Sequence, residues 1–273
     1  MDSSSNKKLR SGIAAGLSAA AASAMTGEAH AALPPKVAGE TRVVLILGDY
    51  WHSSVWQEIQ IRSIYEKNKD WKVLSARFNR FVTPELINDA DLLIVSRSSA
   101  KERMDWTTEG VVESVQGGGI LWTDENVKAV LDGVRNRGMG LMALHCASYA
   151  RNREIFDLVD VEPVMHNQMQ PLWVHDANQE HPITRGIGKF FISLDEQFAA
   201  IIKSAYTTSL FQTTAIHDKR QAVGGWCRES GKGRIVGLLP GHTQVPYGVP
   251  EYREILWRSA YWAMKRDIPP YGG

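Results

Sequence analysis

The 273-residue sequence has little cysteine, almost no excess of either charge and no long apolar run. Two cysteines cannot form the disulfide framework of a small secreted domain, and a chain of this length can bury a core without one. Lysine and arginine number 31 against 30 aspartate and glutamate, so the formal net charge of +1 gives no broad attraction for nucleic acid or an anionic membrane. Beyond the amino-terminal region, no segment reaches the ~18–20 apolar residues of a membrane helix, which predicts no membrane insertion.

Aromatic residues are plentiful by contrast, with nine Trp and eight Tyr. Flat amphipathic rings suit the faces of sugars, and they also anchor protein cores and interfaces. Together with the neutral charge balance, they favour a small or neutral partner.

The amino-terminal 31 residues have the order of an export signal. A basic segment, residues 7–10, precedes an Ala/Gly-rich stretch from Ile13 to Met25, and Ala29-His30-Ala31 fits the small-residue rule for signal peptidase. We therefore predict removal of residues 1–31 and a periplasmic or secreted protein. A disordered Ala-rich tail has a similar composition and is the alternative interpretation.

Strand and helix signals alternate after a linker at residues 32–40. Short apolar runs without alternation are typical of parallel strands that are covered on both faces, and we expect them at residues 42–47, 71–78, 91–95 and 141–144. A helix follows Ser53 or Ser54, and a second begins at Thr123 or Asp124 and ends near Gly138. This rhythm predicts an α/β fold with a mostly parallel sheet and helices on both faces.

The second half is less regular and richer in strand signals. We expect strands at residues 190–198 and 209–216, a hairpin formed by residues 222–226 and 234–239, and a closing helix at residues 251–266. Because no linker-like segment separates the halves, residues 41–268 should form a single domain, followed by a tail at 269–273.

Three histidines each follow an apolar run. His52 lies just beyond the first strand, His145 directly after the fourth, and His242 after the run that ends at Leu239. In open α/β sheets, ligands bind at the carboxyl ends of the strands. The three imidazoles are therefore expected at one edge of the sheet, in a common pocket.

Six sequence motifs carry a family resemblance that spans nearly all of the chain after residue 41. They are Gly48–Ser54, Leu144-His145-Cys146-Ala147-Ser148, His181-Pro182-Ile183-Thr184, Leu194-Asp195-Glu196-Gln197-Phe198, Gly231–Val236 and Gly241-His242. In order and spacing the chain resembles the ThuA-like (trehalose utilisation) family. The resemblance implies a flavodoxin-like, class I glutamine amidotransferase-like fold. It also implies a role in carbohydrate breakdown, often beside a sugar oxidoreductase that makes 3-keto glycosides.

True amidotransferases place a nucleophilic cysteine at the strand-to-helix elbow, and here His145 occupies that position. Cys146 comes one residue later, so its side chain points elsewhere and a working Cys/His pair is not expected. Cys146 next to His145 could still act as an activated thiolate, which leaves a Cys-dependent amide hydrolase as an alternative.

The acidic candidates are Asp195 and Glu196. Neighbouring residues of a strand point to opposite sides, so one of the two faces the site, and the family's Asp-Glu-hydrophobic pattern favours Glu196. Asp195 would then orient a neighbour or cap a turn. The predicted catalytic groups are His145, His52, Glu196 and His242, which would move protons next to a sugar carbonyl in isomerase, lyase or hydrolase chemistry.

Substrate contacts are predicted for a second set of side chains, namely Trp51, Asp49, Cys146, Trp173 and His166. The same pocket could instead be a non-catalytic sugar-binding module in which tryptophan rings stack on pyranose faces, and the sequence does not separate the two.

Metal binding is the remaining open question. His52, His145 and His242 are acceptable ligands for zinc or another divalent ion, but they come from separate strand ends without a short spacing such as HxxxH. Apart from this candidate divalent metal, the sequence indicates no cofactor, and it does not predict the oligomeric state.

Overall fold

The computed structural model describes residues 33–49, 51–98, 106–107, 110–111, 121–149 and 152–272. The expected export signal at residues 1–31 lies outside them, so it stays a prediction. From Lys36 onward the chain forms one compact unit. Within the described part of the chain, no helix is both long and apolar enough to cross a bilayer.

Five parallel strands form one side of a nine-stranded sheet, in the order β2-β1-β3-β6-β13. They are β1 (Thr41–Leu47), β2 (Trp71–Ala76), β3 (Leu92–Ser96), β6 (Gly140–Leu144) and β13 (Gly233–Leu238). Numbered along the chain, this order is 2-1-3-4-5, which is the doubly wound flavodoxin-like arrangement. The predicted fold class is confirmed.

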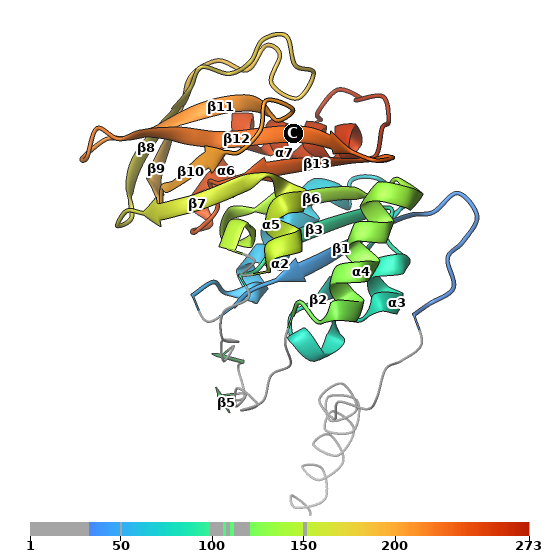
Figure 1. The fold of residues 1–273 in the computed structure, drawn as a ribbon. Coiled ribbons are helices and arrows are strands. Elements are labelled where there is room, and N and C mark those ends of the chain that lie inside the picture. Colours follow the sequence, from blue (N-terminus) through green and yellow to red (C-terminus); the bar gives the residue numbers. More distant parts are fainter. Residues whose placement is uncertain are drawn as a thin grey trace, which may run out of the picture. The chain divides into compact units, whose positions relative to one another are not determined.

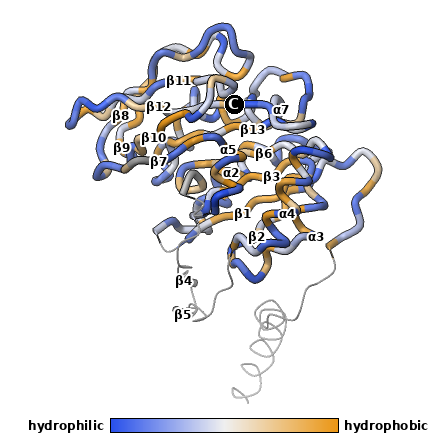
Figure 2. Tube along the Cα trace, viewed as in Figure 1, coloured by the Kyte–Doolittle hydropathy of each residue, from blue (hydrophilic) through white to orange (hydrophobic). Residues whose placement is uncertain are grey.

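Helices cover both faces of these strands, which is why every residue of β1 is buried. One face carries α2 (Ser54–Tyr65) and α7 (Pro250–Ala263), and the other carries α3 (Pro84–Asn88), α4 (Asp124–Asp132) and α5 (Arg153–Val159) (Figure 1). Figure 2 shows hydrophobic residues along β1 and β3 inside the fold and hydrophilic residues in the outer loops.

Local sequence signals explain where several helices begin and end. The Thr123 hydroxyl accepts a hydrogen bond from the backbone N–H of Asn126, so Thr123 is the N-cap of α4. The helix continues as a π-helical turn from Gly133 to Arg137 and stops at Gly138, whose φ of 81° is left-handed. The predicted start and stop of this helix are both confirmed.

Beyond β13 the sheet becomes antiparallel and runs β13-β12-β11-β8-β9, while β10 pairs with β7 in a small second sheet. We call β7 to β12 the antiparallel extension: β7 (Val161–His166), β8 (Gln170–His175), β9 (Phe190–Asp195), β10 (Phe198–Ile202), β11 (Thr208–Ala215) and β12 (Gln221–Ser230). The predicted hairpin is present, and its turn is Gly231-Lys232 between β12 and β13.

Short elements complete the described chain. They are β4 (Trp106–Thr107), β5 (Gly110–Val111), α6 (Val245–Gly248) and two 3₁₀ helices, Asn79–Phe81 and His145–Tyr149.

The structure corrects three details of the sequence prediction. The strand expected at residues 190–198 is two strands, because the chain leaves β9 after Asp195 and joins a different sheet at Phe198. β7 and β8 were not expected as strands. The carboxyl-terminal residues, for which the sequence predicts only a tail, pack on α7, where the Trp257 indole N–H donates to the carbonyl of Pro269.

Candidate active site at the carboxyl ends of the strands

The loop after β1 folds back on itself to hold Asp49 and His52. Gly48 has a φ of 72°, and a Cβ there would lie 2.5 Å from the Cβ of Ser54, so only glycine allows this turn. The backbones of Asp49 and His52 exchange hydrogen bonds of 3.0 and 3.2 Å. Both side chains are consequently fixed at the carboxyl end of β1.

Asp49 fixes the orientation of the His52 ring. One carboxylate oxygen lies 2.6 Å from Nδ1 of His52 and accepts from the N–H of Trp51, and the other accepts from the N–H of Ser98. Burial alone would raise the pKa of Asp49, but the hydrogen bond and charge of His52 outweigh it and lower that pKa below its usual value. The ionised carboxylate keeps the proton on Nδ1, which leaves Nε2 of His52 for the pocket.

His145 lies directly after β6 and is fully buried. Its Nδ1 lies 2.8 Å from the carbonyl oxygen of Leu239, which only accepts, so Nδ1 carries the proton. Burial lowers the pKa of His145 to about 4, although a hydrogen bond with Glu196 opposes this shift. The ring is therefore neutral at pH 7, and its Nε2 faces His242 and Glu196.

His242 lies in the loop after β13 and meets both rings. Its Nδ1 is 3.2 Å from Nε2 of His52 and 3.3 Å from Nε2 of His145. Burial would lower the pKa of His242, but the hydrogen bond and charge of Glu196 raise it above its usual value.

Asp195, at the end of β9, positions the His242 loop from beneath. Its carboxylate accepts backbone hydrogen bonds of 2.8 Å from Gly241, 2.9 Å from His242 and 3.2 Å from Thr243. Burial raises the pKa of Asp195 to about 7, against the backbone N–H groups that favour its ionised form. The sequence-based expectation that Asp195 orients a neighbour agrees with these contacts.

Glu196 occupies the break between β9 and β10 and faces three imidazoles. Oε1 is 2.8 Å from Nδ1 of His166, and Oε2 is 3.2 Å from Nδ1 of His242 and 3.6 Å from Nε2 of His145. Burial would raise the pKa of Glu196, but hydrogen bonds with His145 and His242 lower it below its usual value. Glu196 is thus an ionised carboxylate among ring nitrogens that come from the loops after β6 and β13 and from β7 of the small second sheet.

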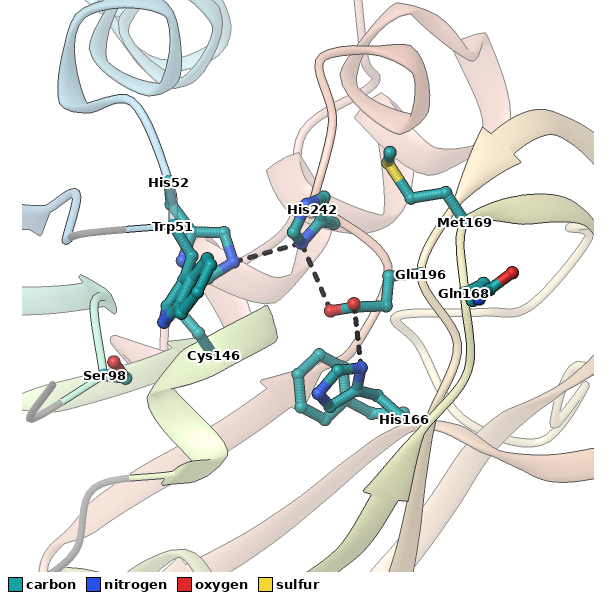
Figure 3. Close-up of a pocket in the computed structure, with 10 residues that line it drawn as sticks. Trp51, His52, Ser98, Cys146, His166, Gln168, Met169, Glu196 and His242 are labelled. Atoms are coloured by element: carbon teal, nitrogen blue, oxygen red, sulfur yellow. Dashed lines mark hydrogen bonds and ion pairs between the residues drawn. The ribbon is translucent and has the colours of Figure 1, made fainter. Parts of the chain in front are cut away.

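A cavity of about 740 Å³ opens above these groups. Figure 3 shows Glu196 and His242 pointing into it between Trp51 and Met169. Its lining residues are Trp51, His52, Ser98, Cys146, His166, Gln168, Met169, Glu196, Phe198 and His242. Of the predicted site residues, His145 and Asp49 are buried and touch the lining residues.

Trp173 is the one predicted substrate contact that the structure places away from this cavity. On β8, buried and exposed side chains alternate, and Trp173 is on the exposed side, where its ring packs on Phe191 and lies beneath the ammonium of Lys189. The sequence favours Trp173 only by its residue type. In the structure, the pairing of β8 with β9 places Phe191 opposite Trp173.

Four lining residues were not predicted. Gln168 and Met169 lie in the turn between β7 and β8, two strands that the sequence did not indicate, and Ser98 follows β3. Phe198 packs edge-on against His145, with 4.5 Å between ring centroids. The only sequence feature that indicates Phe198 as a lining residue is its position two residues after Glu196.

Cys146 lines the cavity but is a poor nucleophile. Its side chain is buried, and burial together with the nearby charge of Asp49 raises the pKa of the thiol well above its usual value. The thiol is therefore protonated at neutral pH, and the structure gives the amide hydrolase alternative no support.

Comparisons with known proteins identify the family of this chain. The family model for ThuA, described as trehalose utilisation, matches residues 42–263. No curated protein matches the chain. Solved structures with a similar fold include a protein described as ThuA-like from Parabacteroides merdae ATCC 43184, with a TM-score of 0.67 and 14% identity over 85% of this chain and 92% of that one.

Two further structures resemble the chain. A protein described as ThuA-like from Bacteroides uniformis ATCC 8492 has a TM-score of 0.61 and 14% identity over 86% of this chain and 95% of that one. The β-galactosidase from Bacillus circulans sp. alkalophilus has a TM-score of 0.54 and 9% identity, over 85% of this chain and 33% of that one. At these identities the likeness concerns the fold alone.

Proposed function

This chain belongs to the ThuA (trehalose utilisation) family, and we propose that it is a carbohydrate-active enzyme acting on a glycoside or 3-keto glycoside. Glu196 and the imidazoles around it move a proton on a carbon next to the sugar carbonyl. The observation that carries this proposal is the contact of one carboxylate with His145, His166 and His242 in a single cavity.

A ketone at C3 of a sugar acidifies the C–H bonds on the neighbouring carbons, so a carboxylate or imidazole can remove one of these protons. The electron pair of the C–H bond then forms an enediolate with the carbonyl. Return of the proton to the former carbonyl carbon moves the ketone by one position. Alternatively, the electron pair expels the oxygen substituent on the carbon beyond the deprotonated one, which leaves an unsaturated ketone, and the expelled oxygen takes up a proton. Neither course needs an oxidant or reductant.

The groups in the cavity supply what these steps require. Glu196 is ionised and can accept a proton, its lowered pKa favours handing that proton on to a neighbouring imidazole, and His166, whose side chain is 52% exposed, can pass it to solvent. The volume of about 740 Å³ falls in the range of pockets that hold small ligands. Trp51 is 65% exposed at the rim, where its ring can stack on a pyranose.

Hydrogen exchange in D₂O tests the proposal directly. The full chain is incubated with a panel of 3-keto glycosides, and mass spectrometry follows deuterium at the carbons next to the ketone and any new product. We expect a gain of one mass unit, or a product, faster than without protein. The parent glycosides are the matched controls, because without a ketone their C–H bonds are not acidified.

Sugar binding without exchange or product would overturn the enzymatic proposal and favour the non-catalytic sugar-binding module. A sugar oxidoreductase that oxidises the C3 hydroxyl is the class of reaction that would supply the substrate. Export of the chain, expected from residues 1–31, would place the reaction outside the cytoplasm.

A further inference from the structure

We propose that Nε2 of His52, Nε2 of His145 and Nδ1 of His242 form a binding site for one divalent cation of the zinc type. The three atoms come from three loops at one sheet edge, and all lie within 4.8 Å of one another. The site lies in the same pocket as the proposed reaction, but cation binding does not require that reaction.

One ring nitrogen of each histidine faces the other two rings. Nδ1 of His52 lies against the Asp49 carboxylate and Nδ1 of His145 against the Leu239 carbonyl, so the Nε2 atom of each ring is turned toward the cluster. Nδ1 of His242 lies near both Nε2 atoms. Three ring nitrogens from three loops therefore meet at one place, which is the arrangement that a shared cation requires.

The distances between the ring nitrogens match those between the ligands of a tetrahedral zinc ion. A tetrahedral zinc ion with bonds of ~2.0–2.1 Å separates its ligand nitrogens by about 3.3–3.4 Å. Nδ1 of His242 is 3.2 Å from the His52 nitrogen and 3.3 Å from the His145 nitrogen. The rings meet nearly perpendicular, with interplanar angles of 74–76°, so their lone pairs converge without stacking of the rings.

Each ligand is held by a second group in the way that metal-binding histidines are held. A carboxylate fixes His52 and a backbone carbonyl fixes His145, which are the two commonest outer partners of such rings. Asp195 fixes the backbone of His242 instead of its ring. The carboxylates of Asp49 and Glu196 also supply negative charge against a dication.

The fourth position faces Glu196 and the cavity. Oε2 of Glu196 lies 3.2–3.6 Å from two of the nitrogens, beside that position. Catalytic zinc sites keep one position for water or substrate, whereas structural sites close it with protein ligands. A three-histidine site next to an ionised carboxylate therefore suits a bound sugar oxygen, and imidazole ligands favour zinc and neighbouring transition metals over magnesium or calcium.

The test uses tag-free full chain, stripped with a chelator and reloaded with Zn²⁺ or Co²⁺. We expect one tightly bound ion per chain by elemental analysis, and a Co²⁺ absorption spectrum typical of a four- or five-coordinate nitrogen-rich site. His242→Ala and His52→Ala should weaken binding, measured by calorimetry, more than the roughly 10–100-fold that loss of an outer partner costs. Asp49→Asn should fall in that 10–100-fold range.

His217→Ala is the matched control, because His217 is exposed and is not among the residues that line the cavity. It should bind the ion as the wild type does. Because His145 is fully buried, His145→Gln is preferred to alanine, and circular dichroism checks that each variant folds.

Wild-type chain that takes up no stoichiometric ion after reloading would overturn the site. So would equal affinity in the His242→Ala and His217→Ala variants. If Glu196→Gln lost the ion as completely as His242→Ala, Glu196 would itself be a ligand, and the fourth coordination position would not be open to water or substrate. Ion binding without hydrogen exchange on keto sugars would refute the proposed reaction alone, and hydrogen exchange by a chain that takes up no ion on reloading would refute the metal site alone.

Discussion

The parallel strands and the antiparallel extension contribute to the pocket in different ways. His52 lies in the loop after β1 and His145 directly follows β6. Their rings are buried, the Asp49 carboxylate fixes His52, and the Leu239 carbonyl fixes His145. Glu196 and His166 come from the extension and are more exposed, with 13% and 52% of their side chains accessible. The parallel part thus provides fixed imidazoles, and the extension provides the acidic group and the solvent-facing wall.

The substitution with the largest expected effect removes the acidic group that the antiparallel extension contributes. Glu196→Gln keeps the shape of the side chain but removes the carboxylate that accepts a proton, and groups of this kind contribute about 10²–10⁴-fold to rate. We expect kcat for hydrogen exchange on a 3-keto glycoside to fall by that factor, with little change in KM.

Glu180→Gln, on an exposed loop of the extension, is the control and should retain full activity. Unchanged kcat in the Glu196 variant would transfer the chemistry to the imidazoles of the parallel part.

Core packing should also differ between the two regions. Ile94 in β3 is fully buried, whereas Ile201 in β10 is 58% exposed. Ile94→Ala should lower the free energy of unfolding by about 2–5 kcal/mol because it removes buried methyl groups and leaves a cavity. Ile201→Ala should change it by less than about 0.5 kcal/mol. Urea denaturation measures both, and equal losses would contradict a core centred on the parallel strands.

The parallel part was largely predictable from the sequence, and the reason is burial. Strands covered on both faces, such as β1, are continuous apolar runs, and such a run needs no knowledge of its partner strand. Placing His52 and His145 at the strand ends followed from the same pattern, as did their expected proximity.

The extension was harder to predict because its strands are half exposed or depend on their partners. β7 contains Pro163 and ends in a histidine, so it lacks a clear strand pattern. The break at Glu196-Gln197 arises because β9 pairs with β8 while β10 pairs with β7, which no local signal shows. Glu196 was selected from the family pattern, and Trp173 from residue type alone.

A moderate effect is expected where the extension supports the His242 loop. Asp195→Asn replaces one carboxylate oxygen with an NH₂ group that cannot accept from the backbone N–H groups of the loop. An unsatisfied buried partner costs about 1–3 kcal/mol, so thermal or urea unfolding should show a loss of that size. Asp176→Asn, at an exposed site, is the control. Equal stabilities of the two variants would show that Asp195 does not hold the loop.

The smallest effect concerns a surface ion-pair network on the parallel side. Burial would raise the pKa of Glu58, but hydrogen bonds from Arg62, Arg77 and Ser75 outweigh it and lower the pKa below its usual value. A lowered folded-state pKa contributes stability that is present above the unfolded value of about 4.3 and is lost as the pH falls through the folded value. Glu58→Gln should therefore cost at most about 1 kcal/mol at pH 7, and less at pH 3.

Asp157, whose carboxylate pairs with Lys203 of the extension, provides the matched comparison. Its pKa is lowered mainly by the hydrogen bond from Lys203, but the pair is open to solvent, so Asp157→Asn should have a smaller effect than Glu58→Gln. Urea denaturation at pH 7 and pH 3, in low and high salt, measures both variants. A Glu58→Gln difference that is as large at pH 3 as at pH 7 would mean that the glutamate acts through packing of its methylene groups instead of its charge.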